Sequence, residues 1–277
     1  MTLTNRNRCY KAGIAAGILA LIIVTAAGIL LLPVYEEAQL ASSRRSEGIF
    51  QRLVTEIAEP APFVPFFTMA CTIVYSLAGI ILVLYFFEKT QSPEILFMGL
   101  FIMSFVFECI RIVIPLKIYV GFPNVYLTNS FRFLFFGRYF GLFSIFAASI
   151  YAAGLNIQKQ QNIIFIYAMI SMIFALGVPV DMLSWDTTLV LLSNFNRTFA
   201  MVETWLIIIT IASFFVAAYT KGSHEYIIIG TGAVLIFAGR NILFGSDTWI
   251  SPVPGLILVS IGTWLVCSKF HRIYLWL

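Results

Sequence analysis

Apolar stretches of about 20 residues make up most of this chain. A membrane hydrocarbon core about 30 Å thick needs about 20 residues of α-helix to cross it, whereas barrel strands need only about 9–11 residues and alternate in polarity. The stretches are Ala12–Val34, Phe63–Phe87, Ile95–Leu116, Asn129–Ala153, Ile163–Leu183, Thr198–Thr220, Tyr226–Gly245 and Pro252–Ser268. We therefore predict an all-α, polytopic transmembrane helical bundle of eight spans.

Composition agrees with this class and leaves almost nothing for a soluble domain. Of 277 residues, 60% are hydrophobic and only 11% are charged, against about 25% charged in soluble domains. The predicted organisation is a cytoplasmic N-terminus with the first span (1–34), an outer amphipathic segment (35–62), and a seven-helix bundle with a short cytoplasmic C-terminus (63–277). The net charge of +4 reflects basic loops, so we expect no nucleic-acid partner.

The basic residues predict the orientation. With both termini in the cytoplasm, as an even number of spans requires, most basic loop residues lie on the inner side, as the positive-inside rule expects. The inner ones are Arg6, Arg8, Lys11, Lys89, Lys159, Lys221, Lys269 and Arg272, and the outer ones are Arg44, Arg45, Arg52 and Lys117. We expect a multi-pass protein of a cell membrane, specifically a bacterial inner membrane, with the lipid bilayer as its main contact.

The first span is interpreted as an uncleaved signal anchor. Its apolar stretch is longer than the usual 7–15 residues of a signal peptide, and no small-x-small cleavage site follows it. If it were cleaved, seven spans with an outer N-terminus would remain.

The only long outer connection precedes the second span. Within it, apolar residues between Ile49 and Ile57 recur at helical spacing, and Pro60 and Pro62 follow. We expect a short amphipathic helix here. It either joins two spans along the membrane surface or acts as a lid over the bundle.

Five ionisable residues lie within the apolar spans, and we call them the charge cluster: Glu108, Arg111, Arg138, Glu203 and Arg240. Such a residue at the bilayer centre costs about 2.5–3.5 kcal/mol on insertion scales, so it needs a partner or a function. At 1.5 Å per residue, all five lie about 4–9 Å outward from their helix centres. A shared depth predicts that they converge between the third, fourth, sixth and seventh spans.

Two interpretations of the charge cluster stay open. In the structural one, Glu–Arg pairs hold the spans in register. In the functional one, three arginines exceed two glutamates, and the surplus guanidinium groups face a cavity that opens outward. Guanidinium matches carboxylates and phosphates with paired donors, so this cavity would bind a small anionic or lipid-like ligand.

A helix break is expected at the same depth. Gly177-Val178-Pro179 interrupts the fifth span, and proline removes an amide donor and clashes with the preceding turn. Breaks at membrane depth survive where neighbouring groups or a wet cavity satisfy the freed backbone. We therefore count Gly177 and Pro179 among the candidate site residues.

Missing residue types argue against catalysis. His224 and His271 lie at inner helix ends, and no span core contains a lysine. A Ser–His protease, a haem or zinc site with histidine ligands and a retinal Schiff base therefore lack their essential side chains. No phosphate-binding glycine loop is present. We expect no enzymatic activity, no cofactor and no metal site.

The remaining function classes are recognition and transport. One span, an outer segment and seven further spans resemble the layout of bacterial seven-helix sensor regions, a likeness of layout that no residue motif carries. We expect the chain to sense an outer ligand and to signal to a membrane or cytoplasmic protein partner. The alternatives are a small-solute permease or exporter, and a structural subunit of a membrane complex.

Overall fold

The computed structural model describes residues 3–42, 61, 63–88, 92–154, 160–178, 185–191 and 196–275. Within them, eight helical spans are long and apolar enough to cross a membrane, which confirms the predicted all-α bundle. The helices are α1 (Leu3–Ser42), α3 (Val64–Phe87), α4 (Pro93–Ser104), the 3-10 helix η1 (Phe105–Ile112), α5 (Val113–Val120), α6 (Asn124–Ala152), α7 (Gln160–Gly177), α8 (Asn196–Lys221), α9 (His224–Phe244) and α10 (Pro252–Leu275).

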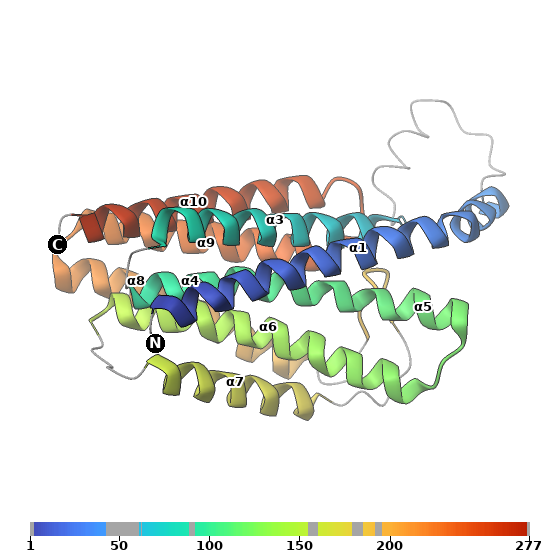
Figure 1. Cartoon of the computed structure of the whole chain (residues 1–277), viewed down its shortest axis with the longest axis horizontal. Helices are drawn as coiled ribbons and strands as arrows, with labels where there is room; N and C mark the ends of the chain where they lie inside the picture. Colours follow the sequence, from blue (N-terminus) through green and yellow to red (C-terminus); the bar gives the residue numbers. More distant parts are fainter. Residues whose placement is uncertain are drawn as a thin grey trace.

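The helices run up and down, and both ends of the chain lie at the same end of the bundle (Figure 1). Helices α4 and η1 lie at the centre, where they pack against α3 and α6. Helix α6 also packs against α7 and α8, and α9 packs closely against α10. Large apolar side chains cover much of the outer surface, as contact with lipid tails requires; examples are Ile173, Trp205 and Trp264.

The third span is longer than the predicted Ile95–Leu116 and is not one uninterrupted α-helix. Ser92 caps its start by accepting a hydrogen bond from the Ile95 amide, 3.3 Å away. Its middle turns are 3-10 helix (η1), in which residues three apart are eclipsed. Phe105, Glu108 and Arg111 follow this spacing and are all buried. The tighter turn therefore aligns both charged residues on the face toward the bundle interior.

The helix of the fifth span, α7, stops short of the predicted end of that span. The predicted span reached Leu183 with a break at Gly177-Val178-Pro179, and α7 ends at Gly177, where the break was predicted. A residue before proline is disfavoured in the α-region, so the helix stops ahead of Val178 and Pro179. Pro179 itself lies outside the described residues, as does the predicted amphipathic helix around Ile49–Ile57.

Glycines allow α6 to approach the third span closely. A Cβ atom on Gly137 would lie 2.4 Å from the Phe107 side chain, and one on Gly141 would lie 2.2 Å from Ser104 Oγ. Small residues at a helix interface let two backbones come together, and here both helices belong to one chain. This close approach brings Arg138, next to Gly137, within reach of Glu108.

Candidate functional site

Glu108 is the centre of a buried ion-pair network. Both carboxylate oxygens accept hydrogen bonds from Arg138, one from Nε at 2.7 Å and one from Nη2 at 2.8 Å. Arg111 Nη1 lies 3.4 Å from Oε2 of the same carboxylate. The Glu108 and Arg111 side chains are 1% and 0% exposed, and that of Arg138 is 17% exposed. Glu108 thus neutralises part of the charge of two arginines from two different spans.

Arg111 also holds the loop of residues 185–191 in place. Its Nε and Nη2 both donate to the Thr188 carbonyl, with an Nε–O distance of 2.9 Å. The loop folds back on itself, because the Asp186 amide donates to the Val190 carbonyl at 2.9 Å. A buried guanidinium whose donors are used by a carbonyl and a carboxylate is well satisfied, so Arg111 serves as a positioning residue.

The second ion pair joins α8 to α9. Arg240 Nη1 donates to Glu203 Oε1, and the arginine side chain is 3% exposed while that of Glu203 is 33% exposed. The guanidinium carbons of Arg138 and Arg240 each lie 4.5 Å from the centroid of the Phe244 ring. Cations within about 6 Å of an aromatic ring are attracted to its face. Phe244 therefore links the two ion pairs into one site.

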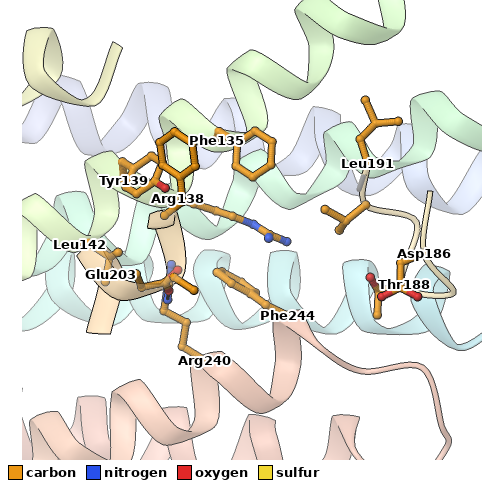
Figure 2. Close-up of a pocket in the computed structure, with 13 residues that line it drawn as sticks. Phe135, Arg138, Tyr139, Leu142, Asp186, Thr188, Leu191, Glu203, Arg240 and Phe244 are labelled. Carbon is orange, nitrogen blue, oxygen red and sulfur yellow. Dashed lines mark hydrogen bonds and ion pairs between the residues drawn. The ribbon is translucent and has the colours of Figure 1, made fainter. Parts of the chain in front are cut away.

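A cavity of about 300 Å³ opens beside these pairs. It lies between α6, α8, α9 and the loop of residues 185–191, toward the end of the bundle opposite both chain ends. Its lining is Phe135, Arg138, Tyr139, Leu142, Asp186, Thr188, Val190, Leu191, Phe199, Ala200, Glu203, Arg240 and Phe244. In Figure 2 the Arg138 guanidinium extends above Phe244, with Glu203 and Arg240 on one side and Asp186 and Thr188 on the other.

Hydrogen-bonding capacity is left over at the cavity wall. Arg138 uses Nε and Nη2 on Glu108, and its Nη1 makes no hydrogen bond to any described residue. Arg240 uses Nη1, so within the described part of the chain its Nη2 is also free of an acceptor. Two guanidinium groups thus keep donors for a further partner, which is the arrangement that binds carboxylates and phosphates.

Of the predicted site residues, the structure brings together all five members of the charge cluster. Gly177 is not among the residues that line the cavity, and Pro179 lies outside the described residues. Sequence reasoning missed Asp186, Thr188 and Phe244. The spacing of Arg240 and Phe244, four residues apart on one helix, was an available signal for the last of these.

Asp186 changes the charge count on which the functional interpretation depended. Three arginines against two glutamates leave a surplus of one positive charge in the charge cluster. Asp186 lines the same cavity and is exposed. Because water screens an exposed carboxylate, the inner wall of the cavity stays cationic while the rim carries an anion.

A second, larger cavity lies on the lipid-facing side between α3 and α10. Its volume is about 470 Å³, and its lining is almost entirely apolar, with Leu82, Phe86 and Trp264 among the exposed side chains. Binding sites combine an apolar wall with a few convergent polar groups. The charged cavity has this combination, and the groove between α3 and α10 has the character of a surface for lipid tails.

Comparisons with known proteins leave the function open. No family model matches the chain, and no solved structure matches it. The chain is similar to an uncharacterised protein of Treponema pallidum (strain Nichols), with 22% identity over 69% of this chain and 69% of the relative.

Proposed function

We propose that this membrane protein is a receptor for a small ligand that carries a carboxylate or phosphate group. The ligand enters the charged cavity from the end opposite the chain termini, which the positive-inside rule predicts to be the outer side. Arg138 and Arg240 bind the anionic group through Nη1 and Nη2. A protein partner in the membrane or the cytoplasm then receives the signal.

The observation that carries this proposal is the pair of guanidinium groups with free donors at the wall of one cavity. A network that served only to hold helices together would direct its donors at other parts of the chain, as Arg111 does. A volume of about 300 Å³ is at the small end of the range of about 300–1,000 Å³ for ligand pockets. The ligand is therefore a small molecule or the headgroup of a lipid.

Binding of anionic probes to the purified protein in lipid nanodiscs tests the proposal. The probes are acetate, succinate and inorganic phosphate, measured by calorimetry against Arg138→Gln and Arg240→Gln. Hydrogen bonds to charged groups contribute about 1.5–3 kcal/mol, so each variant loses about tenfold or more in affinity. Arg132→Gln is the matched control, because Arg132 lies on the same helix but does not line the cavity. Equal affinity of wild type and both cavity variants contradicts the proposal.

Flux separates a receptor from the permease or exporter that remains the alternative. In sealed vesicles that contain the protein, we expect saturable binding of a probe without accumulation inside. Accumulation that Arg138→Gln abolishes would assign the cavity to transport instead. Neither binding nor flux, with every variant of the charge cluster equally destabilised, would leave only the structural interpretation.

A further inference from the structure

The ionisable residues that line the cavity are balanced in number. Arg138 and Arg240 contribute two positive charges, and Asp186 and Glu203 contribute two negative ones. Behind them, Glu108 and Arg111 add one charge of each sign. The whole site is therefore formally neutral although it is strongly charged. The two glutamates pair with the three arginines, so one surplus guanidinium charge and the separate Asp186 carboxylate remain, which is complementary to a dipolar ligand.

Asp186 and Arg138 face the same cavity without forming an ion pair. The ion pairs of the described residues join Arg138 to Glu108 and leave the Asp186 carboxylate without a cationic partner. Within the described part of the chain, that carboxylate accepts hydrogen bonds only from its neighbour Thr187, from the amide at 2.7 Å and from Oγ1 at 3.3 Å. Both a cationic donor group and an anionic acceptor group are thus available, on different walls.

The position of Asp186 is fixed relative to the arginines. Arg111 holds both Glu108 and the Thr188 carbonyl, and Glu108 in turn holds Arg138. Asp186 is two residues from Thr188, and the Asp186 amide is bonded within the loop. The Thr187 hydroxyl shares its single proton between Asp186 Oδ1 and Asp247 Oδ2, the latter at 3.1 Å, and this contact joins the loop to the connection between α9 and α10. The loop therefore presents its carboxylate at the rim of the cavity.

From this arrangement we infer that the ligand is dipolar, with one anionic oxyacid group and one ammonium group. This inference rests on the proposed function, because it places the anionic group on Arg138 and Arg240. The ammonium group lies at Asp186, and the uncharged part of the ligand packs against Tyr139, Phe199 and Phe244. Neutral α-amino acids have this chemistry, and so does the glycerophosphoethanolamine headgroup of a membrane lipid.

A panel of matched probes tests the ammonium group separately from the anionic group. Glycine, alanine, leucine and phenylalanine are compared with acetate, propionate, 4-methylpentanoate and 3-phenylpropionate, which lack only the ammonium group. Glycerophosphoethanolamine is compared with glycerophosphoethanol, which also lacks only the ammonium group. We expect the best dipolar probe to bind about tenfold or more tightly than its matched anion, since a charge-assisted hydrogen bond is gained. Preference for amino acids identifies a free solute, and preference for glycerophosphoethanolamine identifies a lipid headgroup.

The variant Asp186→Asn should affect the dipolar probe and its matched anion in different ways. An asparagine Oδ1 can still accept from the Thr187 amide, so the loop keeps its fold while the negative charge is lost. We expect weaker binding of the dipolar probe and unchanged or tighter binding of the matched anion. Glu225→Gln is the control, because it removes the same charge at the other end of the bundle and Glu225 does not line the cavity. If Asp186→Asn still prefers the dipolar probe over its matched anion to the same extent as the wild type, the assignment of the ammonium group to Asp186 is overturned.

The two proposals fail in different ways. Matched anions that bind as tightly as the dipolar probes overturn the dipolar ligand and leave the anion receptor standing. If the wild-type protein is folded, as its melting curve shows, and binds no probe that carries an anionic group, both the anion receptor and the dipolar ligand are overturned.

Discussion

Two triads of one glutamate and two cations occur in this bundle, and they differ in their access to water. Glu108 lies 2.7 Å from Arg138 and 3.4 Å from Arg111, with exposed fractions of 1%, 17% and 0%. Glu225, in the first turn of α9, lies 2.7 Å from Lys269 and 3.2 Å from Arg272, with exposed fractions of 26%, 16% and 61%. The charges match in number and sign, but Glu108 and Arg111 are almost completely buried, whereas Glu225 and Arg272 are partly or largely exposed.

The difference in burial decides what each triad contributes. Solvent-exposed pairs contribute about 0–1 kcal/mol, because water already stabilises the separated ions. Removal of one partner from a buried pair costs about 3–5 kcal/mol, because the other charge is left without compensation. Removal of the shared carboxylate of the Glu108 triad therefore leaves buried charges without compensation, and this triad lies beside a cavity. The Glu225 triad is a surface feature at the end of the bundle that carries the chain termini.

We expect the two triads to face opposite sides of the membrane. Reporter fusions after Gly222 and at the C-terminus should read cytoplasmic, and a fusion after Asp247 should read external. The expectation follows from the basic residues near the chain termini, among them Arg6, Arg8 and Arg272. Opposite readings at Gly222 and Asp247 would reverse the orientation and place the cavity on the cytoplasmic side.

The largest energetic difference is expected for loss of the central carboxylate. Glu108→Gln leaves Arg111 and Arg138 without their shared counter-charge, so we expect a loss of about 3–5 kcal/mol in the free energy of unfolding. Glu225→Gln is the matched control with the same chemistry in a solvated setting. Denaturant unfolding in detergent micelles, monitored by circular dichroism, measures both. Similar losses for the two variants would show that burial does not distinguish the triads.

A smaller loss of stability is expected when Gly137, which lets α6 approach η1 and so allows the Glu108–Arg138 pair, is replaced by alanine. The added methyl group of Gly137→Ala would lie 2.4 Å from Phe107, so α6 must shift away from η1. Overpacking of this kind costs about 1–3 kcal/mol. Gly28→Ala is the control, because nothing lies within 4 Å of its added methyl group. A Gly137→Ala variant as stable as Gly28→Ala would mean that close helix contact does not support the Glu108–Arg138 pair.

The smallest change in stability is expected for the partly exposed Glu225 triad. We expect Glu225→Gln to change the free energy of unfolding by about 1 kcal/mol or less, and salt to weaken that contribution further. The same unfolding measurement at low and high ionic strength provides the check. A salt dependence that is stronger for the Glu108 pairs than for Glu225 would contradict the assignment of the buried and exposed triads.

The spans could be predicted from sequence because the bilayer imposes one requirement on every helix. Each span must satisfy its backbone within itself and present about 20 apolar residues to lipid, which leaves an unmistakable pattern. The 3-10 helix at Phe105–Ile112 leaves no such pattern. Residues spaced three apart fit an α-helical face nearly as well as a 3-10 face, so the sequence does not separate the two.

Sequence alone identifies the charged residues of the candidate site that lie within spans, but not the site residues that lie in loops. Charged residues within apolar spans are conspicuous, since burial of an unpaired charge is costly, and all five of them were found in this way. Asp186 lies in a polar loop, where a carboxylate needs no explanation. Its position at the cavity depends on the Thr188 carbonyl that Arg111 holds, a contact between residues 77 apart in sequence. Only the tertiary structure reveals such a contact.

The central claim is that the buried charges form a binding site and not only a scaffold. Melting temperatures of Glu108→Gln, Glu203→Gln, Arg138→Gln and Arg240→Gln, each with and without the best probe, test it most directly. Loss of Arg138 leaves Glu108 paired with Arg111, and loss of Arg240 leaves Glu203 one-third exposed to solvent. We predict that the two arginine variants melt near the wild-type temperature but are no longer stabilised by the probe. We predict that the two glutamate variants melt clearly lower, because each strands a buried guanidinium. Equal losses in all four variants, with no probe effect in the wild type, would contradict the account.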